Sequence, residues 1–560
     1  MPEKAFERWK DSDRIQRFEI QRERGKTRVL DIQPFFKSLK RGSLEAAAEM
    51  LASYYKDPSL VKVQPPPTTF GDEFGERLPE TEDEWLWFDQ RVRSDARLTS
   101  VAAEFLYDVL LPKFIPEPKP LRYYSWGTAS RVFFDFPQMC VRMGKTVYVK
   151  TIHRNIRDLS TFAGRSESFS IGAIPPSYYL DITSLYPLCA VATDAYRIID
   201  AVPMTRSELN AITKPDDYYP YCWLHGTFES DNDLWGLPER GKERKFYLTG
   251  RLSGRLRHSL DLQAAKAKII SLDYGYKPVF TDDRKLHDQY AELTLKRIEG
   301  RIQDQIERMG TKEILNSSTG AVGANRPQPT TTSNFPAYST IVAEGHLIAS
   351  RVLDFIPKPI HYMDTDSGFG SSKREGRVFD ITDLNGQWTI PVNLGVKGYG
   401  EHPKVFRSKH YYLDPENYGL HAVQIEYKDW FNIVASLPET ATVHRQVRGT
   451  YRTRSAKGKE LEVGRWYHEK TVWGLPELTN AFRADVKRVR ETYDPYGLAR
   501  DGKWVGSRSL TVPEFHDLTV NEDNETLIAR VEKERRLPVE TVKAWMRERA
   551  KAGQTVAWTR

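Results

Sequence analysis

Two carboxylates separated by a single residue, Asp364 and Asp366, are the feature of this sequence that most restricts its fold. They lie in the segment HYMDTDSGF, residues 361–369, where Tyr362 has strand character and Gly368 favours a tight reversal. The pattern predicts a β-hairpin with both acids at its tip. Carboxylates held this close raise each other's pKa unless a cation compensates, and a divalent metal ion is the strongest compensator.

This segment has two alternative interpretations, an EF-hand calcium loop and an exposed acidic turn. An EF-hand would place Asp364, Asp366 and Glu375 at loop positions 1, 3 and 12, but position 6, which needs glycine, is Phe369. The EF-hand is therefore excluded. An exposed acidic turn capped by Ser367 needs no metal, and this stretch alone leaves that alternative open.

A third acid, Asp181, ends a short strand pattern in SYYLDITSLYP. Two metal ions about 3.5 to 4 Å apart, held by carboxylates from different strands, stabilise in-line displacement at phosphorus. Asp181 and Asp366 are the candidate carboxylates for such a site.

The segment GRIQDQIERMGTKEILNSSTG predicts a helix with one polar, cationic face beside an apolar stripe. Spacings of three and four residues align Arg301, Gln305, Arg308, Lys312 and Asn316 on the cationic face. Arg308 and Lys312 repel each other unless an anion lies between them, and a triphosphate is such an anion. In the alternative, Asp304 pairs with Arg308 on an ordinary solvated surface.

A dense basic run, HRQVRGTYRTRSAKGK at residues 444–459, contains Arg448, Arg452 and Arg454. Such a run suits a nucleic-acid phosphate backbone. It equally suits a strand edge that charge protects from aggregation, and composition does not separate the two.

The 560 residues allow three or four domains, and 39% hydrophobic with 28% charged residues indicates a soluble globular protein. The sequence has no apolar stretch near the roughly 20 residues that span a bilayer, and its first residues are charged, so we expect a cytoplasmic protein without membrane contact. Cys140, Cys189 and Cys222 lack metal or disulfide spacing and are expected to be buried apolar residues.

Taken together, these segments resemble the family B DNA polymerases, and are most similar in style to the protein-primed phage and plasmid members. The family motifs DxxSLYP, KxxxNSxYG and YxDTDS occur in family order as DITSLYP (181–187), KEILNSSTG (312–320) and YMDTDS (362–367). The later KxY motif matches Lys409 and Tyr411, and the loop before the first motif matches TFAGR, which ends at Arg165.

The resemblance implies an α+β fold, a right-hand polymerase with an antiparallel palm sheet, helical fingers and a thumb, preceded by a partial RNase H-like exonuclease remnant. DNA would lie between these parts. The implied boundaries are 1–120 for the remnant, 121–283 for the palm with the first motif, 284–325 for the fingers, 326–430 for the palm with the third and KxY motifs, 431–514 for the thumb and 515–560 for a C-terminal helical extension.

The resemblance also implies a role for each matching residue. Asp181 and Asp366, with Asp364 nearby, would ligate two Mg²⁺ ions, for which Mn²⁺ is an alternative. The incoming dNTP would be bound by Ser184, Leu185, Tyr186, Arg308, Lys312 and Asn316, with the Tyr186 ring excluding a 2′-hydroxyl. Primer-template DNA would be bound by Lys409, Tyr411 and Arg165, and by the basic residues Arg448, Arg452 and Arg454.

The sequence departs from the family at several positions. Thr319 replaces the tyrosine of the second motif, which puts accuracy or template positioning in doubt, and Ala163 replaces a glycine of the preceding loop. Residues 29–51 and 85–110 resemble the second half of the proofreading exonuclease, with Asp95 as its last acid and Arg91 in place of tyrosine. Residues 85–110 have helical spacing. The first half is missing, so we expect no proofreading by this chain.

The predicted function is DNA-directed synthesis from a primer 3′ end. A polymerase-like, catalytically inactive scaffold that only binds DNA is the alternative, and RNA synthesis is disfavoured by Tyr186. The priming mode stays open, and a terminal protein or a separate exonuclease chain are the further partners to test.

Overall fold

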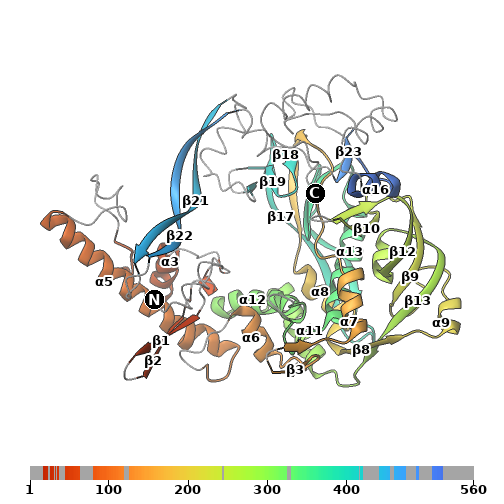
Figure 1. Cartoon of the computed structure of the whole chain (residues 1–560), viewed down its shortest axis with the longest axis horizontal. Coiled ribbons are helices and arrows are strands. Elements are labelled where there is room, and N and C mark those ends of the chain that lie inside the picture. Colours follow the sequence, from red (N-terminus) through yellow and green to blue (C-terminus); the bar gives the residue numbers. More distant parts are fainter. Residues whose placement is uncertain are drawn as a thin grey trace. The chain divides into compact units, whose positions relative to one another are not determined.

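Helices and antiparallel sheets build the chain, whose computed structural model is drawn in Figure 1. The structure describes residues 17–22, 25–30, 32, 35–36, 39, 44–63, 80–118, 125–144, 146–241, 245–324, 329–414, 417–420, 440–454, 460–474, 487–490 and 507–520. The chain divides into two compact units. Unit 1 comprises Met1–Pro137, Glu299–Ala321 and Thr450–Gly464, and unit 2 comprises Gln138–Ile298, Val322–Gly449 and Arg465–Arg560.

Unit 1 is mainly helical. Its helices are α3 (Leu44–Tyr55), α5 (Glu82–Glu104), α6 (Trp126–Phe133) and α12 (Gln305–Val322), with the short segments η1 (Phe105–Leu110) and η2 (Leu111–Lys113), and a hairpin pairs β1 (Arg17–Arg22) with β2 (Gly25–Leu30). A capping box between Thr81 and Glu84 begins α5, which buries Leu98 and Ala102. The helical spacing predicted for residues 85–110 is therefore confirmed.

Helix α12 begins at Gln305, so Arg301 of the predicted cationic face lies before it, in residues without regular structure. From Gln305 onward the helix has the two faces that its sequence predicts. Ile306 is buried, whereas Arg308 and Lys312 are exposed. Gly310 lies so close to Phe114 that a Cβ atom there would come within 2.2 Å of the ring, so this contact requires glycine. Asp304 caps the helix by accepting from the Ile306 N–H and pairs with Lys113 at 2.7 Å. The alternative in which Asp304 pairs with Arg308 is wrong, because capping already uses that carboxylate.

A six-stranded antiparallel sheet forms the part of unit 2 that carries the acids of interest. Its order is β16 (Gly376–Thr382), β17 (Thr389–Gly400), β7 (Ser177–Ile182), β15 (Ser367–Gly370), β14 (Ile360–Asp364) and β5 (Ser166–Ser168). The predicted hairpin is confirmed, with Asp364 opposite Ser367. Helix α8 (Leu185–Ala192) follows β7 and packs against α13 (Phe335–Phe355), which is buried along most of its length.

A second antiparallel sheet in unit 2 has the order β12 (Gly250–His258), β9 (Trp223–Ser230), β13 (Lys268–Phe280) and β8 (Ile198–Pro203). Strand β11 (Lys245–Leu248) precedes β12 but pairs with β10 (Leu237–Arg240). The sequence of residues 245–280 predicts a hairpin, a helix and a further strand. The helix and the last strand occur, but the hairpin prediction is wrong, because β11 and β12 pair with different strands. Phe228 and Leu252 of this sheet share a core with Val512 and Phe515 from far along the chain.

Shorter elements complete the described residues. In unit 2 they are β3 (Val141–Met143), β4 (Thr146–Tyr148), α7 (Thr151–Asn155), η3 (Ile156–Ser160), β6 (Gly172–Ala173), η4 (Ala195–Arg197), α9 (Arg206–Asn210), α10 (Ser259–Ala264), α11 (Lys285–Ile298), β18 (Lys404–Arg407), β19 (His410–Tyr412), β20 (Tyr418–Leu420), β23 (Arg488–Arg490), β24 (Ser507–Ser509) and α16 (Val512–Val520). The long strands β21 (Ala441–Arg454) and β22 (Glu460–Trp473) form a two-stranded sheet.

Several further predictions can be compared directly with the structure. The three cysteines are free and buried, as predicted. None of the helices within the described ranges is long and apolar enough to cross a membrane. The finger boundary at residue 284 falls at α11, which belongs to unit 2, whereas α12 belongs to unit 1. The charged tail beyond residue 520 lies outside the described residues, and the domain boundaries stay a prediction.

Candidate active site

Three carboxylates from two separate segments lie together at one end of the six-stranded sheet. Asp181 of β7 is opposite Ser367 of β15, and Asp364 of β14 is opposite the same serine. Asp366 occupies the turn between β14 and β15, and its carbonyl accepts from the Ile182 N–H at 2.6 Å. Register alone therefore gathers Asp181, Asp364 and Asp366, which we name the acid trio.

The turn that carries two of the acids is tightly constrained. Thr365 has a left-handed backbone, with a φ of 63°, and its N–H donates to the Arg165 carbonyl at 2.5 Å. The Ser367 hydroxyl donates to the Asp364 carbonyl at 3.1 Å. A Cβ atom at Gly164 would lie 2.6 Å from the Thr365 hydroxyl oxygen, so the loop before β5 approaches the turn closely enough to need glycine.

Two lysines partly neutralise the acid trio. Lys409 Nζ donates to both carboxylate oxygens of Asp364, at 2.8 and 2.9 Å, and Lys397 Nζ lies 2.5 Å from Asp181 Oδ1. Both ammonium groups are about half exposed, at 46% and 50%. Burial and the neighbouring Asp181 carboxylate raise the pKa of Asp366 to about 6. The trio thus keeps a surplus of negative charge, and crowding of the carboxylates destabilises their ionised forms.

The trio suits hard divalent ions. Asp181 Oδ1 is buried and accepts no well-aligned hydrogen bond, although Lys397 is near. Carboxylate oxygens are the donors that Mg²⁺ and Mn²⁺ prefer. Asp181 and Asp366 could therefore hold two ions, with Asp364 beside them, and this role stays a prediction.

Three tyrosines, Tyr179, Tyr362 and Tyr411, pack beside the acid trio. The Tyr362 hydroxyl donates to Asp364 at 3.3 Å and accepts from the Lys409 N–H at 2.9 Å, while Tyr179 pairs with the Ser367 hydroxyl at 3.2 Å. The Tyr411 ring packs 5.0 Å from Tyr362 and is only 8% exposed. We therefore expect Tyr411 to position the site rather than to contact DNA with its ring. Lys409, in contrast, is accessible.

The residues after Asp181 begin helix α8. Ser184 has a left-handed φ of 58° and its hydroxyl accepts from Arg297 Nε of α11 at 3.0 Å. Leu185 is 3% exposed and packs in the core, so any effect on a nucleotide would be indirect. The Tyr186 ring approaches Gly345 of α13, and burial raises the pKa of its hydroxyl. Its predicted role toward the sugar is untested.

Arg165 is buried, whereas a residue that contacts DNA must be accessible. Its guanidinium is 2% exposed, pairs with Glu167 at 2.7 Å, and lies 4.2 Å from the centre of the Tyr247 ring. Arg488 also reaches Glu167, at 3.3 Å. Although burial disfavours its charged form, the two arginines outweigh that effect and lower the pKa of Glu167. The prediction that Arg165 binds DNA is not favoured, because the side chain already has buried partners.

The other predicted residues remain as expectations. Arg308, Lys312 and Asn316 are exposed along α12, and neither cation forms an ion pair within the described part of the chain. Arg448, Arg452 and Arg454 lie on β21, and their side chains fall outside the described residues. Their roles toward a triphosphate and toward DNA stay predictions.

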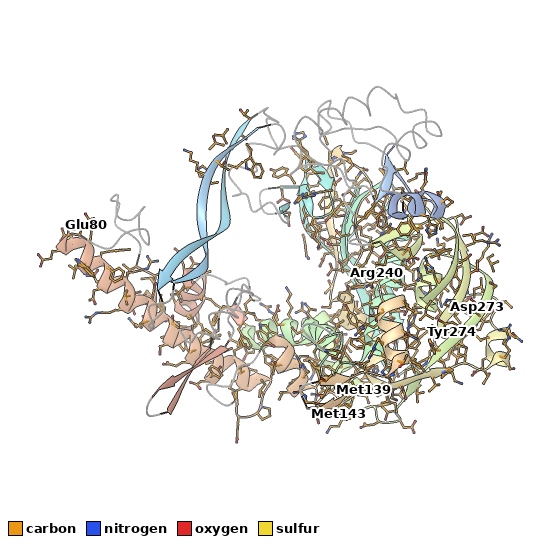
Figure 2. All side chains as sticks on the ribbon, in the orientation of Figure 1. Glu80, Met139, Met143, Arg240, Asp273 and Tyr274 are labelled. Atoms are coloured by element: carbon orange, nitrogen blue, oxygen red, sulfur yellow. The ribbon has the colours of Figure 1, made fainter. Side chains whose placement is uncertain are left out.

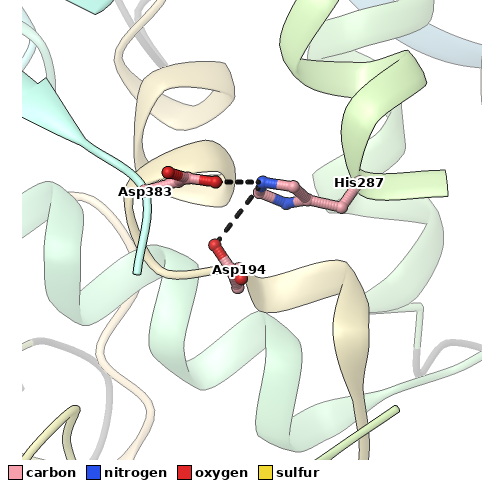
Figure 3. A group of neighbouring side chains, drawn as sticks. All are labelled: Asp194, His287 and Asp383. Carbon is pink, nitrogen blue, oxygen red and sulfur yellow. Dashed lines mark hydrogen bonds and ion pairs between the residues drawn. The ribbon is translucent and has the colours of Figure 1, made fainter. Parts of the chain in front are cut away.

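Sequence reasoning missed a second group of acids, drawn in Figure 3. His287 Nε2 lies 3.4 Å from Asp194 and 3.3 Å from Asp383, and all three side chains are at most 1% exposed. We name Asp194, His287 and Asp383 the buried cluster. Arg284 pairs with Asp383 at 2.6 Å and Arg197 with Asp194 at 2.7 Å, so each acid already has a cation.

The buried cluster is therefore a structural ion network. Gln387 and Trp388 donate backbone N–H groups to the remaining Asp383 oxygen, at 2.7 and 3.0 Å. Burial lowers the pKa of His287 despite its two carboxylate neighbours. No local pattern could have indicated the cluster, since His287 and Asp383 are 96 residues apart.

Comparisons with known proteins give distant structural similarity only. No protein-family model and no curated protein matches the chain. Phi29 DNA polymerase complexed with primer-template DNA and incoming nucleotide is similar over 82% of this chain and 83% of its own, at 13% identity and a TM-score of 0.49. The family B DNA polymerase from the archaeon Pyrobaculum calidifontis is similar over 71% and 42%, at 13% identity and a TM-score of 0.29. Similarity at these levels does not by itself establish a common fold.

Proposed function

We propose that this protein is a template-directed DNA polymerase of the family B type, which adds deoxynucleotides to a primer 3′ end. The observation that carries the proposal is the convergence of Asp181, Asp364 and Asp366 on adjacent strands. These are the acids of two family motifs that the sequence separates widely. An inactive scaffold would have little reason to keep like charges so close, because crowding them is costly.

Each part of the site has a stated task in this proposal. Asp181 and Asp366 would hold two Mg²⁺ ions, which when bound would stabilise the attacking and leaving oxygens of the phosphoryl transfer. Lys409 would orient Asp364 through its two hydrogen bonds. Tyr186 lies on α8 with its ring against Gly345 of α13, and it would exclude a 2′-hydroxyl by its bulk. Catalysis would then rest mainly on positioning and electrostatics.

Primer extension on a defined template tests the proposal. Asp181→Ala should abolish extension, while Asp380→Ala, an exposed acid of β16 in the same sheet, should leave it intact. Extension that survives Asp181→Ala would refute the assignment. Binding of primer-template by a wild-type protein that extends nothing would favour the scaffold instead.

Sugar selection is a separate test of the same site. Tyr186→Val should allow ribonucleotides to be incorporated at a rate closer to that of deoxynucleotides, because a smaller side chain replaces the ring that would exclude the 2′-hydroxyl. The matched control is Tyr178→Val, a partly buried tyrosine of β7. Equal discrimination in Tyr186→Val and wild type would remove Tyr186 from this role.

The proposal includes synthesis without proofreading. Asp95, which resembles the last acid of the exonuclease, pairs with Arg91 at 3.3 Å within α5. Magnesium-dependent release of nucleotides from a mismatched, 3′-labelled primer, abolished by Asp95→Ala, would contradict this part.

A further inference from the structure

The segment at residues 161–166 comprises the loop before β5 and the first residue of that strand, Ser166, and it lies directly against the turn of the acid trio. The Arg165 carbonyl accepts from the Thr365 N–H at 2.5 Å, and Gly164 allows the close approach described above. Residues 161–165 form no strand or helix, so their carbonyl groups are open to side-chain donors. What binds these carbonyls is therefore placed beside the candidate catalytic centre.

Three cationic side chains bind carbonyls of this loop. Arg240 Nη2 donates to the Thr161 carbonyl at 2.7 Å, Lys245 Nζ to that of Ala163, and Lys487 Nζ to that of Ser166 at 2.5 Å. We name Arg240, Lys245 and Lys487 the cationic strip; Arg240 is labelled in Figure 2.

The strip is assembled from segments far apart in the chain. Arg240 of β10 and Lys245 of β11 are direct register partners across their hairpin. Lys487 comes directly before β23, and that strand is anchored to the loop region by Arg488, which pairs with Glu167. Folding thus brings three like charges to one short loop, an arrangement that electrostatics alone disfavours.

The two strip residues of the β10–β11 hairpin, Arg240 and Lys245, are not neutralised by acids of the described residues. Glu239, beside Arg240, is paired with Arg255 and Arg257 at 2.9 and 2.7 Å. Within the described residues neither Arg240 nor Lys245 forms an ion pair, and Arg240 otherwise lies 5.8 Å from the centre of the Phe162 ring. Burial, together with repulsion from Arg240 and Lys487, lowers the pKa of Lys245 to about 8. A bound polyanion would remove this repulsion.

The strip continues toward the acids through Lys409. Ser408 donates to the same Ser166 carbonyl that accepts from Lys487, at 2.8 Å, and the next residue, Lys409, contacts Asp364. Cations are therefore spread along one loop whose end meets the catalytic turn. A linear polyanion with regularly spaced charges fits such a spread better than a single compact anion does.

We propose that the cationic strip binds the sugar-phosphate backbone of primer-template DNA next to the catalytic turn. This inference rests on the proposed polymerase function. It assigns a DNA contact to Arg240, Lys245 and Lys487, which lie outside the sequence motifs. Arg240 is exposed and the two lysines are half-buried, whereas Arg165 is fully buried.

Equilibrium binding of a fluorescent primer-template duplex at several salt concentrations tests the strip. The double variant Arg240→Gln/Lys245→Met should bind at least several-fold more weakly at low salt. Its plot of log affinity against log salt should lose about 0.7 to 0.9 of slope for each phosphate contact removed. Lys245→Arg should keep most of the affinity, and Arg251→Gln, an exposed arginine of β12, should match wild type.

A second readout separates a DNA contact from a nucleotide contact. At saturating DNA, the KM for dNTP should be unchanged in the double variant. A raised KM with unchanged DNA affinity would overturn the inference, because the strip would then hold the triphosphate. Unchanged DNA affinity and salt slope in a variant with a wild-type unfolding transition would overturn it as well.

The two proposals fail in distinguishable ways. A wild-type protein that binds duplex through the strip but extends no primer would refute the polymerase function and leave the strip standing. A wild-type protein that extends primers while the double variant binds DNA normally would refute only the strip.

Discussion

The acid trio and the buried cluster both gather carboxylates within unit 2, yet their surroundings are opposite. In the buried cluster, Asp194 and Asp383 meet His287 (Figure 3). Two arginines and backbone N–H groups complete the pairing. In the acid trio, three carboxylates meet two half-exposed lysines.

This difference separates charge that stabilises a fold from charge that is available for chemistry. Buried carboxylates paired with arginines are already compensated, and a metal ion would have to displace those partners. Carboxylates that keep a surplus charge and face half-exposed lysines can exchange those lysines for a divalent ion. The comparison therefore assigns a structural role to the buried cluster and supports the proposed metal-binding role of the acid trio.

The largest expected effect is on synthesis. Asp366→Asn should lower the rate of primer extension by about 10³-fold or more, because metal-assisted charge stabilisation contributes several kcal/mol. The same variant should unfold no more easily than wild type in EDTA, since a crowded negative charge is removed. Asp383→Asn should keep most of its extension rate at a temperature where it is folded. If Asp383→Asn lost extension and Asp366→Asn kept it, the catalytic role would belong to the buried cluster instead.

The next effect is on stability. Asp383→Ala should lower the free energy of unfolding by about 3 to 5 kcal/mol, because Arg284 and His287 would lose a buried partner. Urea denaturation at neutral pH measures the change. Asp380→Ala, which removes an exposed partner of Arg377, should change it by less than about 0.5 kcal/mol. A loss below about 1 kcal/mol for Asp383→Ala would argue against a stabilising network.

Glu344 of α13 is a third kind of acid to set beside the acid trio and the buried cluster. It belongs to neither group, and among the described residues it has no arginine within 4 Å. Burial raises its pKa from 4.5 to about 7. The folded protein therefore keeps a proton that the unfolded chain loses, so wild-type stability falls as pH rises from about 4.5 to 7 and levels off above that.

Glu344→Gln removes this titration. The stability of the variant relative to wild type should increase by about 2 to 3 kcal/mol between pH 5 and pH 8. Thermal or urea unfolding at both pH values measures it, with Glu292→Gln, a surface acid paired with Lys296, as the control. A variant that tracks wild type across this range would mean that Glu344 is charged in the folded state.

The smallest expected effect concerns Lys397. Lys397→Met should raise the apparent affinity for Mn²⁺ several-fold, since an ion pair of this exposure contributes about 1 kcal/mol or less. The shift of the unfolding temperature during Mn²⁺ titration reports the affinity without any activity assay. Lys373→Met, a surface control, should match wild type. Weaker Mn²⁺ binding by Lys397→Met would contradict competition between the lysine and the ion.

Local patterns predicted much of the framework. The alternation before Asp364 and the turn residues after it predicted the β14–β15 hairpin, and the three-and-four spacing around Arg308 predicted both faces of α12. These signals act over a few residues, within one element. They failed where capping competed with pairing, as at Asp304, and where neighbouring strands joined different sheets, as with β11 and β12.

Partners from distant segments left no such signal. Lys397 is the extra residue of a β-bulge in β17, and that bulge together with the pairing of β17 and β7 places it beside Asp181. Arg297 reaches Ser184 from α11, and Arg165 is buried by aromatic rings that come from other strands. Each of these contacts depends on a register between strands or a packing between helices.

The sequence by itself determined which chemical groups this protein has and on which local elements they lie: paired acids at a hairpin tip, a third acid at a strand end, and a cationic helix face. Only the tertiary structure decided which charges are neutralised and which stay available. The physical reason is that compensation falls off with distance and depends on burial, so the state of each carboxylate is set by the side chains that folding brings to within a few ångströms.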